Sequence, residues 1–124
     1  MSGSGAMLLF GGPEHKAFLG CLNCGAYNET SVCNQYGEFG SQYKPDSIWN
    51  AYGTYGSKYN PYSPWNAYST TPPIIVDEAG HSYGYFTVNK CHGDRTRIDW
   101  LVKVLDVYTE TGDLDLAREQ LCAR

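Results

Sequence analysis

The sequence predicts a small α+β fold built as a single domain. Three observations support this prediction: β-rich stretches within residues 8–24 and 74–89, an aromatic repeat at residues 27–70, and helical spacing of apolar residues within 95–122. A chain of 124 residues is long enough for one domain with a single modest core. We expect the C-terminal helices to pack across the sheet.

The opening segment "MSGSGAM", residues 1–7, has the composition of an expression scar and is excluded from the predicted domain, residues 8–124. Met7 is either the native start or stands in place of a signal peptide. A cytoplasmic location and an exported one therefore both stay open at this stage.

Residues 8–24, "LLFGGPEHKAFLGCLNC", predict two short apolar strands separated by the turn segment "GGPEHK". Their end carries Cys21 and Cys24 in a Cys-x-x-Cys pair, which is compatible with a redox dithiol, half of a zinc site or a structural pair. Gly25 follows at once and no helical pattern begins there, so no helix dipole would lower a thiol pKa. We predict structural thiols, reduced in the cytosol or disulfide-linked after export, and expect no metal and no cofactor.

Residues 27–70 contain an internal repeat with a period of 16 residues in three copies. The matching positions are Tyr27, Tyr43 and Tyr59; Ser31, Ser47 and Ser63; Asn34, Asn50 and Asn66; and Tyr36, Tyr52 and Tyr68. Each unit is predicted to form one short helical turn, because Ser47 occupies an N-cap position and Gly53 the position of a left-handed C-cap. Pro64 directly follows Ser63, as is favoured at the first position of a helix. Such short units must stack to bury an apolar face.

The aromatic residues of the repeat have two interpretations. Trp49, Trp65, Tyr52 and Tyr68 could form a ladder of rings that stacks on sugars, bases or an extended peptide. Alternatively, the tryptophan and tyrosine rings fill the space between units, which we favour because a glycine-rich segment has few other large side chains. Cys33 stands where the other copies carry Trp, so we expect it to be a small packing residue.

The C-terminal part predicts a β-hairpin and then helices. Residues 74–89 supply two β-rich arms, 74–76 and 83–88, around the loop "DEAGHS". From about Arg95 to Tyr108 the apolar residues recur at helical spacing, and a second helix is expected after Asp113, which can cap it. The helical end of the chain is thus predicted at residues 95–122.

Several of these segments together resemble a known group of sequences. The stretches "LLFGGPEHKAFLGCLNC", "SIWNAYGTYGS", "SPWNAYSTTPPIIVDEAG" and "GYFTVN" are similar to small bacterial hypothetical proteins, some related to sequences on mobile or environmental gene cassettes. The resemblance covers about residues 8–103. It implies no reaction, cofactor or catalytic residue.

A basic cluster precedes the first predicted helix. Lys90, His92, Arg95 and Arg97 lie within "NKCHGDRTR", although positive charge is disfavoured at a helix N-terminus. Either nearby carboxylates neutralise this basic cluster, or it binds an anion such as phosphate, sulfate or a carboxylate.

Composition excludes several classes of function. The net charge of −4 argues against general nucleic-acid binding, and no apolar stretch is long enough for a membrane span. Neither a nucleophile elbow nor a phosphate-binding loop is present. We therefore expect a non-catalytic binding module whose partner is a protein, a glycan or a small anionic ligand. The alternatives are a small enzyme acting on an anionic substrate through His92 or a Cys-x-x-Cys thiol, and a redox or metal protein; homo-oligomerisation stays open.

Overall fold

The structure, a computed structural model, describes residues 6–123 and has the α+β architecture that the sequence predicts. Its elements are β1 (Leu8–Gly11), the short 3₁₀ helix η1 (Pro13–His15), β2 (Ala17–Cys21), β3 (Ile74–Val76), β4 (Ser82–Tyr85), α1 (Asp99–Thr111) and α2 (Leu114–Cys122). Residues 1–5 of the predicted expression scar lie outside the described part of the chain. Met7, also assigned to that scar, belongs to the fold, because its carbonyl accepts a hydrogen bond of 2.7 Å from the Leu22 amide.

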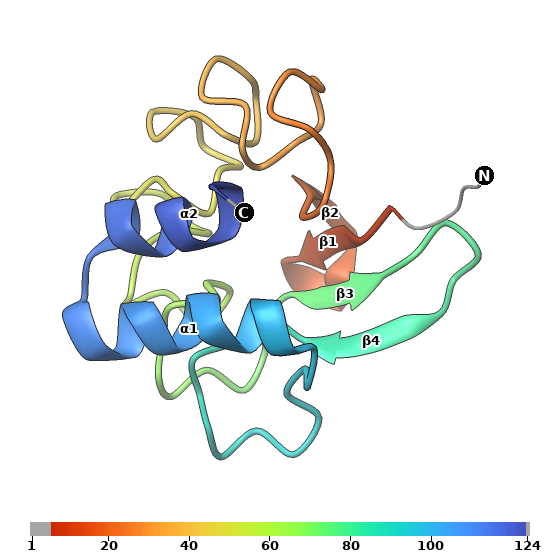
Figure 1. Cartoon of the computed structure of the whole chain (residues 1–124). Coiled ribbons are helices and arrows are strands. Elements are labelled where there is room, and N and C mark those ends of the chain that lie inside the picture. The colour runs from red at the N-terminus through yellow and green to blue at the C-terminus, as the bar shows by residue number, and fades with distance from the viewer. Residues whose placement is uncertain (1–5, 124) are drawn as a thin grey trace.

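The four strands form one antiparallel sheet in the order β2-β1-β3-β4 (Figure 1). The two central strands align Leu9 of β1 with Ile75 of β3, and both residues are fully buried. Beyond the outer strands, Cys21 at the end of β2 forms a parallel bridge with Ser31, and Tyr85 of β4 forms one with Arg95. Backbone from the repeat and from the segment before α1 therefore covers part of each sheet edge.

The β3–β4 hairpin is closed by Asp77. Its carboxylate accepts hydrogen bonds from the Tyr83 hydroxyl at 2.8 Å and from the backbone N–H groups of His81 and Ala79. These bonds, that of Tyr83 first, lower the pKa of Asp77 to about 2. Strand β3 coincides with the predicted arm 74–76, while β4 begins one residue before the predicted arm 83–88 and already ends at Tyr85. The amides of Phe86 and Val88 donate instead to the carbonyls of Pro73 and Pro64.

Helix α1 begins at Asp99, later than the predicted start near Arg95. Residues 95 and 96 instead continue the sheet edge, since the Thr96 amide donates to the Tyr85 carbonyl at 2.8 Å. The helix ends at Gly112, which has the left-handed φ of 66°. Helix α2 follows directly, and the Asp113 side chain caps it as predicted by accepting from the amide of Asp115.

The segment of residues 27–70 contains no helix, so the predicted helical turns are not present. The chain instead makes successive single turns. In these, the backbone amide of Asn50 donates to the Ser47 carbonyl, and the backbone amide of Gly53 donates to the Asn50 carbonyl. The Ser47 hydroxyl accepts from the Trp49 amide and the Asn50 side chain from the Tyr52 amide, so each turn is closed locally. Gly53 does not have the left-handed conformation expected of a C-cap.

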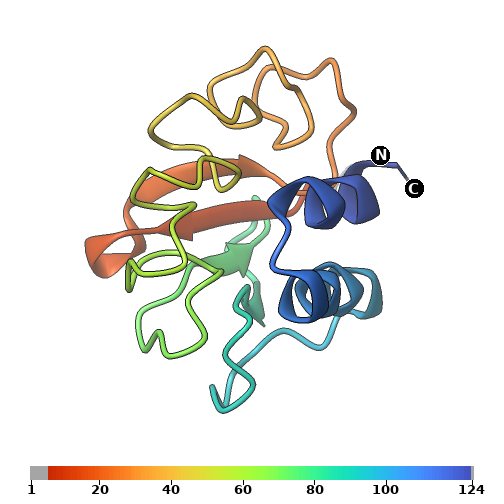
Figure 2. The same ribbon diagram turned by 90° about the vertical axis from the view of Figure 1, so that its left-hand side faces the viewer.

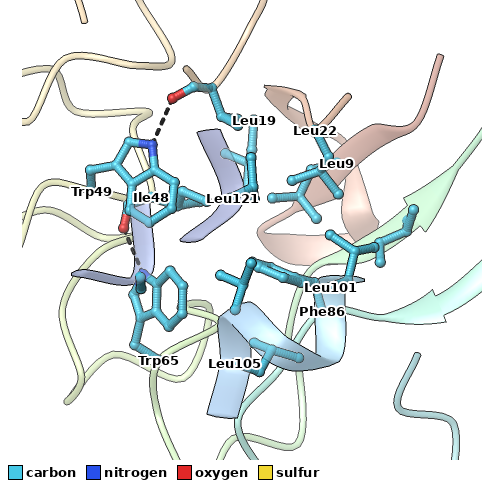
Figure 3. Packing of buried hydrophobic residues seen from close by; sticks show 14 of the residues in the cluster. Leu9, Leu19, Leu22, Ile48, Trp49, Trp65, Phe86, Leu101, Leu105 and Leu121 are labelled. Atoms are coloured by element: carbon cyan, nitrogen blue, oxygen red, sulfur yellow. Dashed lines mark hydrogen bonds between the residues drawn. The ribbon is translucent and has the colours of Figure 1, made fainter. Parts of the chain in front are cut away.

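Both repeat tryptophans are buried in the core and make the same contact. Trp49 Nε1 donates to the Val32 carbonyl at 2.7 Å, and Trp65 Nε1 donates to the Ile48 carbonyl at 2.6 Å, each one unit back along the chain. Figure 3 shows the two rings beside Leu121, Phe86 and Leu105, which come from the helices and from the segment after β4. Their exposed fractions of 3% and 1% confirm the prediction that these rings fill space.

Two disulfides join four of the five cysteines in the described part of the chain. Cys21 pairs with Cys24, so the two predicted structural thiols form a bond to each other. Cys33 pairs with Cys122, which ties the first unit of the repeat to α2. Cys33 is therefore a cross-link and not the simple packing residue that its place in the repeat suggested.

Candidate ligand-binding face

Six tyrosines of the repeat project into solvent. Their exposed fractions lie between 80% and 100%, although each ring offers a large apolar surface. We call them the tyrosine face: Tyr27, Tyr36, Tyr43, Tyr52, Tyr59 and Tyr68. Each unit contributes two of them, from its first and tenth positions. A regular array of exposed aromatic rings is typical of a recognition surface, whereas isolated exposed apolar residues are not.

The turns fix the backbone from which these rings project. The amides of Tyr36, Tyr52 and Tyr68 donate to the side chain of the asparagine two residues earlier, at 3.0, 3.1 and 2.9 Å. The amides of Tyr43 and Tyr59 donate in the same way to serine hydroxyls, both at 3.2 Å. Because side chains lock these turns, the backbone that carries the rings is already ordered before any ligand arrives.

Three hollows lie between the repeat and the two helices. Figure 2 shows the backbone of the repeat, coloured from orange to green, and the two helices in blue. Their volumes are about 430, 830 and 570 Å³. The repeat contributes residues 27 and 33–36 to the first hollow, 43 and 49–52 to the second, and 59 and 65–68 to the third. These sets are related by the period of 16 residues, so each hollow has a pair of exposed tyrosines at equivalent places. The second hollow is also lined by residues 42 and 56–59, so Tyr59 is a third exposed tyrosine there and borders the third hollow as well.

The residues that α1 and α2 contribute differ from one hollow to the next. Asp115, Arg118 and Glu119 of α2 line the first hollow, where burial lowers the pKa of Arg118. In the third hollow, Tyr108 of α1 packs against Trp65 with 4.9 Å between ring centroids. Burial raises the pKa of Tyr108.

The second and third hollows are adjacent and share lining residues. Tyr108 and Gly112 border both from the helical side. Lys58 borders both from the repeat, and its ammonium lies 5.3 Å from the centre of the Tyr59 ring. The first and second hollows share Asp115. The three hollows therefore form a row along the helices.

The structure separates the four residues that were named as a possible ladder for a ligand. Trp49 and Trp65 are buried and offer almost no free ring surface, as the favoured space-filling interpretation predicted. The same interpretation is wrong for Tyr52 and Tyr68, which project into solvent on the tyrosine face. The four other tyrosines of the face were not singled out individually from the sequence. The signal was present, because the period places a tyrosine at both positions in all three units.

The structure brings the four residues of the basic cluster together around a separate hollow of about 550 Å³ at the N-terminal end of α1. Arg95 is turned inward: its Nε donates to the Thr87 carbonyl at 2.9 Å, and its Nη2 lies 3.7 Å from the Asp106 carboxylate. The His92 ring packs on Tyr85, and its Nδ1 accepts from the Asp94 amide. Lys90 and Arg97 are exposed. These two residues are the available charges of the cluster.

If the basic cluster binds an anion, phosphate and sulfate should raise the melting temperature of the folded protein with concentration. The measurement is a thermal melt in phosphate or sulfate, with chloride at matched ionic strength as control. The Lys90→Ala, Arg97→Ala double variant should lose the shift, since both side chains are exposed and their removal leaves the core intact. Equal shifts in the wild type and the variant would mean that the cluster is only a locally neutralised surface.

Within residues 6–123, no group of three or more His, Cys, Asp or Glu side chains is placed to hold a metal ion. Cys21 and Cys24 are joined as a disulfide, so in this form neither thiol is a nucleophile or a metal ligand. Cys91 is an exposed free thiol. No helix in the same range has the length and apolar character needed to cross a membrane.

Comparison with protein-family models, with curated proteins and with solved structures found no match to this chain. A function for it has therefore to be inferred from its own residues and their arrangement.

Proposed function

We propose that the protein is a non-catalytic binding module whose tyrosine face holds an extended ligand. The observation that carries the proposal is the row of three hollows lined by the same repeat positions. A ligand that spans the row binds the second and third hollows intramolecularly, so weak individual contacts combine into a much higher overall affinity.

The chemistry of tyrosine suits this role. A tyrosine ring offers a large rigid contact area at a low cost in conformational entropy, and its hydroxyl both donates and accepts hydrogen bonds. The turns that carry the rings are already closed by asparagine and serine side chains. The backbone of the turns therefore needs little ordering on binding, which favours affinity.

The basic cluster is a second candidate site on the same module. Its support is the hollow that Lys90, His92, Arg95 and Arg97 line together. This hollow shares no residue with the row beneath the tyrosine face. A small anionic ligand there would be independent of the tyrosine face, and the thermal melts described above test it.

The disulfides support a location in an oxidising compartment. Two bonds, Cys21–Cys24 and Cys33–Cys122, engage four of the five cysteines of the chain. Such bonds form and persist in secreted and periplasmic proteins and are rare in the cytosol. Of the two locations left open by the sequence, export agrees better with these bonds.

The experiment compares a triple variant, Tyr36→Ala, Tyr52→Ala and Tyr68→Ala, with the matched triple Phe variant. Both are tested for binding to cellulose, chitin, mannan, poly-L-proline and heparin. We expect the wild type and the Phe variant to be retained on at least one of these polymers and the Ala variant to be lost from it. Thermal melts should be nearly equal for all three proteins, because the rings are exposed. Retention on no polymer, or retention unaffected by the Ala changes, would contradict the proposal.

A further inference from the structure

We propose that the ligand of the tyrosine face is a neutral, β-linked polysaccharide whose sugar rings occupy the three hollows in succession. This inference rests on the proposed binding function and names its ligand class. Three features of the face support it: the periodicity of the hollows, their charge, and the hydrogen bonds already made beneath the rings.

The first feature is periodicity. On the wall that the repeat forms, the three hollows present the same repeat positions, including a pair of equivalent tyrosines each, at a fixed interval along the chain. A wall with equivalent positions favours a polymer with chemically equivalent units. A polysaccharide of identical sugars meets this condition along its whole length, whereas a peptide meets it only if its own sequence repeats in register.

The second feature is charge. Across the row, the cations Lys58 and Arg118 stand beside the carboxylates of Asp113, Asp115 and Glu119. Two cations among three carboxylates give no excess of positive charge, so an anionic polymer such as a nucleic acid or a sulfated glycan gains nothing from this lining. An uncharged ligand does not depend on such an excess and is therefore favoured over an anionic one.

The third feature is the state of the hydrogen-bonding groups under the rings. The indole N–H groups of Trp49 and Trp65 donate to main-chain carbonyls. The side-chain amide of Asn50 accepts from the Tyr52 backbone N–H and donates to the Lys44 carbonyl. A peptide main chain brings its own donors and acceptors, which must be paired when buried. These groups are already used, and the bridges at Ser31 and Arg95 obstruct addition of a peptide strand at the sheet edges.

A pyranose ring has the complementary chemistry. Its axial C–H groups form an apolar face that stacks on an aromatic ring, while its equatorial hydroxyls point outward to water and to tyrosine hydroxyls. In an extended β-linked chain such faces recur at regular intervals. Six rings at repeated positions therefore provide stacking surfaces for successive sugars.

The test is calorimetric titration of the intact protein with cello-, manno- and chito-oligosaccharides from two to eight sugars. For one of these series we expect affinity to rise at least tenfold between the shortest and the longest member, as contacts in successive hollows add. Tyr52→Ala in the central hollow should remove most of this gain, while Tyr52→Phe should keep it. The Tyr52 ring is 98% exposed, so neither change should alter the thermal melt.

Paired polymers test the charge argument. Hydroxyethyl cellulose and carboxymethyl cellulose share a backbone and differ in the charge of their substituents, so we expect the first to bind more tightly. Equal or stronger binding of carboxymethyl cellulose would overturn the assignment to a neutral ligand.

The failures of the two proposals are distinguishable. Tyrosine-dependent binding of poly-L-proline, with none of the glycans bound, would overturn the polysaccharide assignment and leave the binding module standing. Binding of none of these polymers would overturn both.

Discussion

Replacing Trp65 by alanine is expected to lower the free energy of unfolding by about 3–5 kcal/mol, the range for removing a core aromatic side chain. The ring is only 1% exposed and packs on Phe86 and Tyr108, with centroid separations of 5.6 and 4.9 Å. Its removal leaves a cavity where the repeat, the segment after β4 and α1 meet. Chemical denaturation of wild type and variant measures the loss.

Two further variants separate the contributions of the ring. Trp49→Ala should cost a similar amount, because Trp49 makes the equivalent bond to the preceding unit. Trp65→Phe keeps an aromatic ring but leaves the Ile48 carbonyl without its indole donor, which should cost about 1–3 kcal/mol. An unchanged denaturation midpoint in Trp65→Ala would show that the ring does not support the core.

The regular elements could be predicted from the sequence because their signals are local. The apolar residues of α1 recur at helical spacing, and Asp113 and Gly112 mark the boundary between the two helices. The start of α1 was predicted too early, since nothing local shows that Thr96 pairs with Tyr85 on the sheet edge. That pairing depends on where β4 lies in the folded chain.

The conformation of the repeat was mispredicted for a different reason. Serine and glycine at a spacing of six residues fit the caps of one helical turn, but Ser47 and Asn50 instead close separate turns with their own side chains. The glycines serve close packing: a Cβ on Gly56 would lie 2.0 Å from the Asn50 carbonyl oxygen, and one on Gly40 equally close to that of Asn34. Residue preferences at helix caps carry no information about this contact between residues six positions apart.

The candidate site could be predicted only in part. The period identifies the repeated aromatic residues, but which rings face inward depends on the helices that close the hollows from the other side. Trp49 and Trp65 have apolar partners there, whereas Tyr52 and Tyr68 project away. The inward turn of Arg95 likewise depends on Asp106, eleven positions further along the chain.

Breaking the Cys33–Cys122 disulfide is the second change for which we expect a large effect. The bond joins residues 89 positions apart, and closing a loop of that length in the unfolded chain corresponds to about 4–5 kcal/mol of stability. The Cys33→Ser, Cys122→Ser double variant should lose most of this amount in chemical denaturation. The matched Cys21→Ser, Cys24→Ser variant removes a bond between residues only 3 positions apart and should lose about 2 kcal/mol by the same relation.

The Cys33–Cys122 bond also bears on the binding face. Both cysteines line the first hollow, so the bond holds the first unit of the repeat against α2 at one end of the row. The double variant should therefore bind short oligosaccharides in the second and third hollows normally but lose part of the affinity gained with the longest ones. The same titrations measure this, at a temperature where the variant is still folded. If the variant keeps the full length dependence, the first hollow is not a subsite, and the row that the ligand spans is limited to the two units whose tryptophans lie in the core.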